Sequence, residues 1–251
     1  MDLARLTGVL RSLAIYRLRP GRVRRMARFY GQFVARGELA IDVGAHVGDR
    51  VAAFRSLGAR VVAVEPQPHL ARLLRLLNRL DRKVTVLDCA LGAAEGEATL
   101  RVNRANPTLS TLSPDWAGTV AASPRFPGER WDEGVAVRVS SLDALIRAHG
   151  VPSFIKVDVE GFEAEVLAGL TYAVPALSFE YLPETPRAAV DCVWRLAALA
   201  PYRFNACRGE GFTWEHRFWL GPTEMATWLA RRPLEDGGGD VYAALRVPGK
   251  R

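Results

Sequence analysis

The sequence places a glycine turn and an acid at the spacing of a nucleotide-cofactor site. The turn, Asp42-Val-Gly-Ala-His-Val-Gly48, follows a short apolar run, and Glu65 ends the next apolar run. Gly44 and Gly48 let the backbone pass close to a ligand, and a carboxylate at the end of the second strand can accept hydrogen bonds from ribose hydroxyls. The pattern predicts an adenosine-binding site, because it has a strand, a turn, a helix, a second strand and an acid in this order.

The spacing of the glycines indicates the kind of cofactor. A dinucleotide fingerprint has three glycines that bring backbone amides to a pyrophosphate, whereas here three residues separate Gly44 from Gly48, with His46 between them. Asp42 at the start of the turn favours a cationic ligand over a pyrophosphate. The pattern therefore predicts a smaller, phosphate-free cofactor. It argues against a nicotinamide-dependent dehydrogenase, for which a Tyr-x-x-x-Lys pair is also missing.

The turn and a later segment, Phe154-Ile-Lys-Val-Asp-Val-Glu-Gly-Phe-Glu163, together resemble the FkbM family of S-adenosylmethionine-dependent methyltransferases. The resemblance spans about residues 39–182 and includes Glu65-Pro66, Ala90-Leu91-Gly92, 140–145 and 165–169. It implies an α/β, class I (Rossmann-like) methyltransferase fold: a mostly parallel seven-stranded sheet with an antiparallel last strand and helices on both faces. It also implies methyl transfer to a hydroxyl of a small-molecule acceptor, namely a sugar, a glycolipid or a secondary metabolite. The alternative is a non-catalytic cofactor-binding or assembly protein that keeps the fold.

Three acids are the candidate catalytic residues. Asp158 and Glu160 end the predicted fourth strand and Glu180 ends the fifth, and ligands bind at this edge of open α/β sheets. If the fourth strand continues that far, Asp158 and Glu160 share a face, where one accepts the hydroxyl proton and the other holds the methionine ammonium or a backbone amide. Alternatively, both acids only bond to amides ahead of Gly161. The three carboxylates would suit a divalent metal, but the sequence assures no third ligand, and we expect none.

Further residues are predicted around the cofactor. Cys89 and Ala90 follow the third strand, where the class I fold packs the adenine ring, and Asp88 either lies near the adenine amino group or caps a turn. His46 positions the cofactor, acts as a base or has only a structural role. The residues predicted to bind the cofactor are Asp42, Gly44, Ala45, His46, Gly48, Glu65, Pro66, Asp88, Cys89, Ala90 and Asp158.

Length and composition fit one α/β domain. With 251 residues and 49% hydrophobic content, the chain can bury a full core. No apolar run approaches the ~18 residues that cross a bilayer, and the start lacks the apolar region and cleavage site of a secretory signal. The cysteines are too few and too scattered for a disulfide framework or a zinc site, which predicts reduced thiols and a cytoplasmic location. They are Cys89, Cys192 and Cys207.

Positive charge is concentrated at the N-terminus. Residues 1–36 carry a net charge of +8, whereas residues 37–251 carry −1. Apolar residues recur at helical spacing over 3–13 and 26–34. We therefore expect a basic helical extension, 1–36, before a methyltransferase domain, 37–251. The extension is expected to pack on the sheet or over the cofactor cleft; the alternative is peripheral contact with an anionic membrane at its inner face. Nucleic-acid binding is the least favoured interpretation, and we expect none.

The remaining pattern alternates strands and helices, as a parallel sheet with crossover connections requires. Between short strands predicted at 96–102 and 135–139, residues 103–134 show little periodicity and form the predicted substrate-covering insertion. Ser110 and Thr111 align with a Ser/Thr pair in the insertion of the resembled family and are the candidate substrate residues. The other predicted elements are strands at 84–88, 176–181, 202–207 and 241–247 and helices at 49–57, 69–80, 163–170, 186–199 and 222–231.

Overall fold

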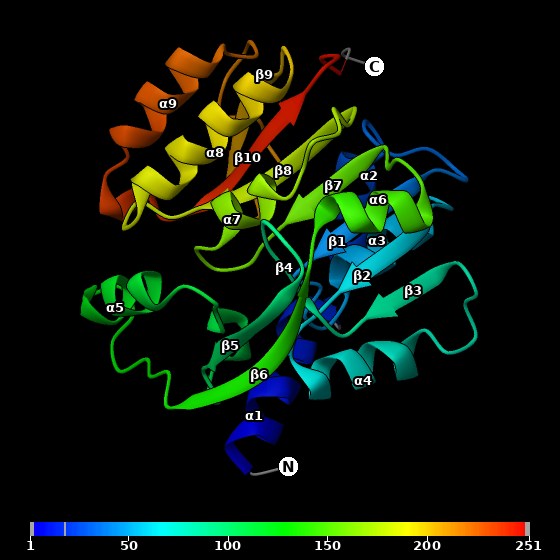
Figure 1. Ribbon diagram of the computed structural model, residues 1–251, viewed down its shortest axis with the longest axis vertical. Coiled ribbons are helices and arrows are strands. Elements are labelled where there is room, and N and C mark those ends of the chain that lie inside the picture. The colour runs from blue at the N-terminus through cyan, green and yellow to red at the C-terminus, as the bar shows by residue number, and fades with distance from the viewer. Residues whose placement is uncertain (1–2, 18, 249–251) are drawn as a thin grey trace.

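A seven-stranded, mostly parallel sheet forms the centre of the computed structural model, which describes residues 3–17 and 19–248 (Figure 1). The strand order is β3-β2-β1-β7-β8-β10-β9. β10 pairs antiparallel with both β8 and β9, and every other pair in this sheet is parallel, which confirms the predicted class of fold. The strands are β1 (Leu39–Val43), β2 (Arg60–Val64), β3 (Val84–Leu87), β7 (Phe154–Val157), β8 (Ala176–Tyr181), β9 (Arg203–Arg208) and β10 (Gly239–Ala244).

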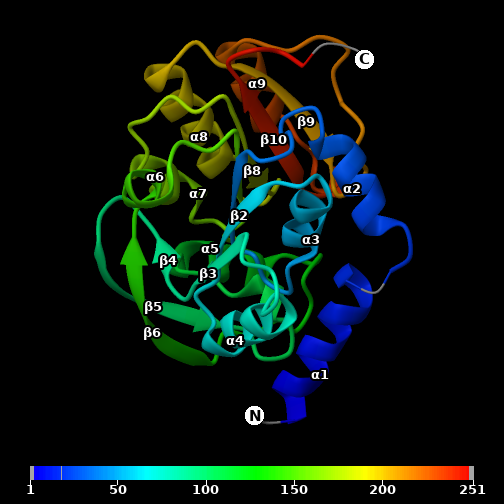
Figure 2. The same ribbon diagram turned by 90° about the vertical axis from the view of Figure 1, so that its right-hand side faces the viewer.

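Helices cover both faces of the sheet (Figures 1 and 2). On one face the core joins the sheet to α6, α7, α8 and α9, and on the other it joins the sheet to α2, α3 and α4. Most predicted helices are confirmed, with ends shifted by up to three residues. The helices are α2 (Arg22–Tyr30), α3 (Asp49–Ser56), α4 (Pro68–Leu77), α6 (Leu142–His149), α7 (Glu163–Ala168), α8 (Pro186–Leu199) and α9 (Pro222–Ala230).

The central strands are buried on both faces. Every side chain of β1 and β7 is buried, and central parallel strands carry apolar residues almost throughout for this reason. Two charged residues interrupt the apolar pattern: Asp42 in β1 is 1% exposed and Lys156 in β7 is 0% exposed. A buried charge requires a partner or a shifted pKa, so both positions bear on the candidate site.

The turn between β1 and α3 packs tightly against the end of β7. Gly44 has a φ of 81°, and a Cβ at this position would lie 1.8 Å from the carbonyl oxygen of Asp158. Gly48 has a φ of 79°, and its Cβ would lie 2.6 Å from Leu74. Glycine is therefore required in this turn by the close approach of protein atoms as well as by the left-handed backbone.

The insertion after β3 contains a second, three-stranded sheet. Its order is β4-β6-β5, with β4 (Ala90–Leu91), β5 (Gly96–Val102) and β6 (Glu133–Ser140), so both short strands predicted here are confirmed. The irregular stretch between them holds a 3-10 turn, η2 (Pro107–Leu109), and a helix that the sequence pattern did not reveal, α5 (Pro114–Ala122). The hydroxyl of Ser113 caps α5 by accepting a hydrogen bond from the Trp116 amide at 3.2 Å.

The N-terminal segment is helical and packs on the domain, as the first of the three interpretations predicts. It consists of α1 (Leu3–Ser12), a π-helical turn, η1 (Leu13–Arg17), and α2. Met26 and Tyr30 of α2 are fully buried, and the Tyr30 ring lies 5.5 Å from that of Phe154 in β7. The side chain of Leu3, part of the predicted apolar stripe of α1, lies outside the described residues.

Two further properties accompany this arrangement. The three cysteines are free and buried. Within the ranges 3–17 and 19–248, no helix combines the length and the apolar character that crossing a bilayer requires.

Because α2 completes the core, Met26→Ala should lower the free energy of unfolding by about 2–5 kcal/mol. The neighbouring Arg24 is exposed, so Arg24→Ala should change it by no more than about 0.5 kcal/mol. Urea titrations of both variants measure the difference. Equal stability of the two variants would show that α2 is not part of the cooperative unit.

Candidate active site

Two adjoining cavities open at the carboxyl ends of the central strands. The wider one has a volume of about 320 Å³ and the narrower one about 50 Å³. Both are lined by the glycine turn, the insertion and the segment after β7, and the residues that they share are Gly44, His46, Thr108, Asp158 and Glu160. One elongated ligand can therefore occupy the narrow cavity and reach into the wide one.

Glu65 is fixed at the wall of the narrow cavity. Its side chain accepts hydrogen bonds from the backbone amides of His46 at 2.8 Å and Gln67 at 2.9 Å. A carboxylate has about four acceptor positions, so about two remain for a ligand. Burial raises the pKa of Glu65 to about 7, and hydroxyl donors from a ligand would favour the ionised form. The position matches the ribose-binding role predicted for this residue.

Apolar side chains form most of the remaining wall of the narrow cavity. Cys89, Ala90 and Pro66, which are predicted to bind the cofactor, line it, and Ser110 lines it rather than the wide cavity. A volume of about 50 Å³ has room for a few water molecules, and residues of the segment 107–112 form one wall of this narrow space. The apolar residues of the wall are Val43, Val64, Leu91, Leu100, Leu112, Val159 and Phe162.

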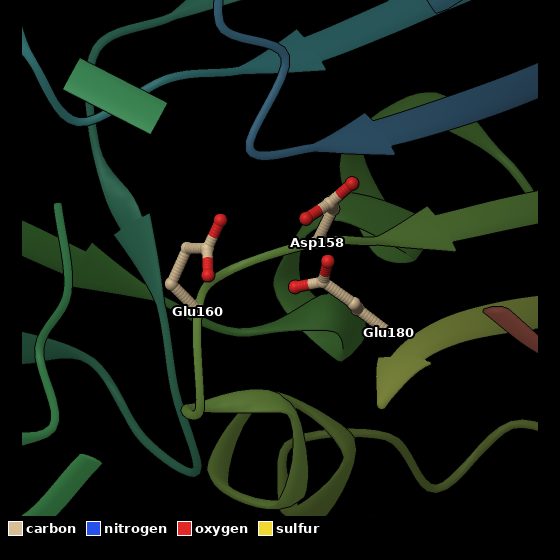
Figure 3. Close-up of side chains that lie close together, drawn as sticks. All are labelled: Asp158, Glu160 and Glu180. Carbon is tan, nitrogen blue, oxygen red and sulfur yellow. The ribbon is translucent and has the colours of Figure 1, made fainter. Parts of the chain in front are cut away.

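Three carboxyl groups converge in the wide cavity (Figure 3). Oxygen atoms of Asp158, Glu160 and Glu180 all lie within 4.8 Å of one another. Glu180 is the penultimate residue of β8, and Asp158 directly follows β7. The sequence argument for Asp158 and Glu160 assumed a continued strand, which was wrong: β7 ends at Val157, and Glu160 has a left-handed φ of 55°. The acids meet because the backbone turns, not because they alternate along a strand.

Asp158 belongs to a network of ion pairs. Its Oδ2 lies 3.1 Å from Lys156 Nζ and 3.4 Å from Arg50 Nη2. Lys156 Nζ also donates to Asp240 Oδ1 at 2.7 Å. Burial alone would raise the pKa of Asp158, but Lys156 and Arg50 outweigh it and hold the pKa below its usual value. Asp158 is therefore a stable anion and a weak base.

The pKa values of Glu160 and Glu180 are shifted in the opposite direction from that of Asp158. Burial, followed by repulsion from Asp158, raises the pKa of Glu160 well above its ordinary value. Burial and repulsion from Glu160 and Asp158 raise that of Glu180 in the same direction. Carboxyl groups this close cannot all ionise without a nearby cation. In this cluster Asp158 is therefore ionised, and Glu160 and Glu180 are stronger bases than Asp158.

His46 lines both cavities in a strained conformation. Its φ is 48°, in the left-handed region, and its ring lies edge-on to Tyr16 at 5.7 Å. Burial lowers the pKa of His46 to about 4, so the imidazole is neutral at physiological pH and a poor general base. Its Nε2 is buried and has no hydrogen-bond partner among the described residues, which favours a role in positioning a bound ligand.

Residues distant in sequence close the other side of the wide cavity. Tyr16 and Glu210 line it, and Arg22 connects the two segments by pairing with Asp49 at 2.8 Å and with Glu210. Arg50 Nη2 lies 3.5 Å from Glu210. The N-terminal helices thus reach the rim of this cavity. The carboxylates of its lining are Asp49, Asp158, Glu160, Glu180, Glu210 and Asp240.

Four predicted site residues line neither cavity. Asp42 is buried in β1 with neither carboxylate oxygen hydrogen-bonded, and burial raises its pKa to about 7. Asp88 pairs with Arg75 and Arg138 near the surface. Gly48 packs against Leu74, and Thr111 is buried and donates to the Glu160 carbonyl at 2.6 Å. A direct contact of these four residues with a ligand in either cavity is therefore not supported by their positions.

Sequence reasoning did not find several residues of the site. Lys156 left a signal, because a lysine within an apolar strand requires buried acidic partners. Arg50 is the second residue of α3, and a cation in a helix's first turn is unusual. Tyr16, Glu210 and Asp240 left no local signal, since the fold brings them to the site from distant segments.

The fold and the paired cavities define a class I, Rossmann-like methyltransferase. The Methyltransferase FkbM domain model matches residues 42–185. The chain therefore belongs to the FkbM methyltransferase family, and its cofactor is S-adenosylmethionine. No curated protein matches the sequence.

Solved structures with a similar arrangement are distant in sequence. A TehB-like S-adenosylmethionine-dependent methyltransferase from Corynebacterium glutamicum is 12% identical, with 94% of each chain covered and a TM-score of 0.47. The O-methyltransferase from Bacillus cereus, in complex with S-adenosylhomocysteine, is 12% identical, with 98% of this chain and 92% of that chain covered and a TM-score of 0.45. Fibrillarin from Aeropyrum pernix with natively bound S-adenosylmethionine is 11% identical, with 84% and 68% covered and a TM-score of 0.46.

The network around Lys156 gives a prediction for stability. Lys156→Met leaves the buried carboxylate of Asp240 without its cation and leaves Asp158 with Arg50 alone. It should lower the free energy of unfolding by about 3–5 kcal/mol at neutral pH. The paired Asp158, with its lowered pKa, stabilises the native chain above its unfolded pKa and loses this contribution as pH falls. The deficit of the variant should therefore shrink on acidification, as denaturation over a pH series would measure.

The double variant Lys156→Met/Asp240→Asn serves as the control. It removes the unpaired charge at position 240 and should recover part of the loss. A deficit that is independent of pH and unchanged in the double variant would mean that Lys156 acts through packing alone.

Proposed function

We propose that this protein transfers the methyl group of S-adenosylmethionine to a hydroxyl oxygen of a sugar, a glycolipid or a secondary metabolite. The observation that carries the proposal is the convergence of Asp158, Glu160 and Glu180 where the narrow cavity meets the wide one. An ionised acid and acids of raised pKa at one point are suited to binding a cationic group and removing a proton nearby.

The residues of the narrow cavity fit the adenosine part of the cofactor. Glu65 offers its free acceptor positions to ribose hydroxyls, and the apolar wall suits an adenine ring. The unpartnered Nε2 of His46 and the ionised Asp158 fit the polar methionine part, because Asp158 favours a cation beside it. When bound, S-adenosylmethionine supplies an electrophilic methyl group on a sulfonium.

Glu180 is the best placed base among the three acids. Asp158 is committed to Lys156 and Arg50, and its low pKa makes it weakly basic. Glu180 lines the wide cavity, has no cationic partner among the described residues and has a raised pKa, which brings its basicity closer to the working pH. Glu180 would accept the proton of the acceptor hydroxyl, whereas Asp158 would hold the cationic part of the cofactor and Glu160 would orient the acceptor.

The wide cavity supports a hydroxyl-bearing acceptor. Carboxylates accept hydrogen bonds from hydroxyl groups, and six line this cavity. Leu109, Phe126 and Leu182 add apolar surface to the same wall, which suits the ring of a sugar or a hydrophobic metabolite.

Cofactor binding tests the first half of the proposal. Glu65→Ala removes the acceptor of the ribose hydrogen bonds and should weaken S-adenosylmethionine binding by about 1.5–3 kcal/mol in isothermal titration. Asp88→Ala, at the end of the next strand but outside both cavities, should bind normally. NAD should not bind to the parent chain. Unchanged affinity in Glu65→Ala, or tight binding of NAD, would refute this assignment.

Turnover tests the second half. In an assay with a panel of sugars, glycolipids and polyketide-type alcohols, Glu180→Gln should lower methyl transfer by about 10²–10⁴-fold while cofactor affinity is retained. For the parent, the rate should rise with pH through the raised pKa of Glu180 and then level off. Asp158→Asn should mainly weaken cofactor binding.

Two outcomes would redirect this part of the proposal. Loss of activity in EDTA, restored by magnesium, would assign the three carboxylates to a metal ion instead of a base. Cofactor binding without methylation of any acceptor class would favour a non-catalytic role.

A further inference from the structure

A third hollow lies apart from the candidate active site. It is a groove of about 1150 Å³ between α2, the edge strand β9 and residues 211–219, on the side where Figure 2 shows α2 beside the edge of the sheet. It shares no lining residue with the two cavities at the carboxyl ends of the strands. A function for this groove is therefore separate from cofactor and acceptor binding.

The charge of the groove is of one sign. Arg25, Arg28 and Arg217 line it, and no aspartate or glutamate does. All three arginines are exposed, and none has an ion-pair partner among the described residues. The wide cavity of the candidate active site is the reverse, with six carboxylates in its lining. The groove is thus complementary to an anionic ligand or surface.

The aromatic side chains of the groove favour a lipid surface over stacked bases. Trp214 packs on Trp219 at 5.2 Å and on Phe29 at 4.8 Å, so these rings are engaged within the protein. Phe218 is 70% exposed, but Arg217 lies over its ring at 5.2 Å. Nucleic-acid binding by stacking requires free ring faces, whereas tryptophan edges and an exposed phenylalanine suit a membrane interface.

The packing of α2 determines how this face of the protein would contact a membrane. An amphipathic helix that binds a bilayer buries its apolar face among the lipids, but Met26 and Tyr30 of α2 are fully buried in the protein core. The arginines on its outer face remain available. Contact would therefore be superficial, through arginine side chains and Phe218, without insertion of the helix.

We propose that this groove docks the protein on the surface of an anionic phospholipid membrane. Arg25, Arg28 and Arg217 bind the phosphate groups of the lipids, and Phe218 enters the boundary between head groups and acyl chains. Attraction of this kind grows with the number of arginines near the surface and decreases with salt. The proposal does not depend on the identity of the acceptor or on methyl transfer.

Co-sedimentation of the full chain with vesicles tests the proposal. The parent should sediment with phosphatidylcholine vesicles that contain phosphatidylglycerol at low salt, and remain in solution with phosphatidylcholine alone. Arg25→Glu/Arg28→Glu/Arg217→Glu should weaken vesicle binding by about 100-fold or more. Phe218→Ser should remove the part of the binding that persists at high salt.

A triple variant on another face controls for net charge. Three other arginines, Arg72, Arg79 and Arg82, are exposed near α4 and outside the groove. The control variant Arg72→Glu/Arg79→Glu/Arg82→Glu changes the net charge by the same amount as the groove variant. It should bind vesicles more tightly than the groove variant does. Circular dichroism and S-adenosylmethionine titration verify that each variant is folded.

Three results would overturn the proposal. They are failure of the parent to bind anionic vesicles, equal loss of binding in the two triple variants, and tighter binding of single-stranded oligonucleotides than of vesicles through the same arginines. The last result would assign the groove to a nucleic acid.

Discussion

Lys156 is enclosed at the centre of the sheet and is held there by Asp158 and Asp240. The ammonium of Lys156 connects β7 to β10, two strands that are not adjacent in the sheet, and it fixes the ionised state of Asp158. Burial raises the pKa values of Glu160 and Glu180, and repulsion from that fixed negative charge adds to the shift. Burying an ion pair of this kind costs desolvation energy, so the pair as a whole adds little net stability. The main effect of Lys156 is to hold the acids in position and to keep Asp158 ionised.

Backbone geometry determines the shape of the same region. Gly44 lies against the Asp158 carbonyl, while His46 and Glu160 adopt left-handed conformations that cost about 1–3 kcal/mol each. All of them lie where the two cavities meet. Such strain persists only when the surrounding structure imposes it, and here the amide of His46 is held by Glu65 and the carbonyl of Glu160 by Thr111. The supporting residues are thus as necessary to the site as the residues that line it.

The sequence predicted the features that have short-range causes. Apolar runs predicted the strands of the sheet, and the glycine turn with Glu65 predicted where the narrow cavity lies, because the strand–turn–helix unit is local. The helix α5 was not predicted because its polar and apolar residues do not separate onto two clear faces. A serine such as Ser113 occurs too often outside helix starts to identify one by itself. Asp88 was placed near the cofactor from strand order alone, but its pairing with Arg75 and Arg138 depends on contacts that no local pattern encodes.

The wide cavity draws its walls from segments that are far apart in the sequence. Tyr16 precedes the glycine turn, whereas Gly238, Gly239 and Asp240 follow β9, and Arg22 of α2 pairs with the distant Glu210. Contacts this distant form late in folding because long loops must close first. On the ribosome, the β1 turn and β2 can associate while the acceptor side of the cavity is still missing. Formation of the wall opposite the glycine turn therefore lags behind formation of the turn itself as the chain folds.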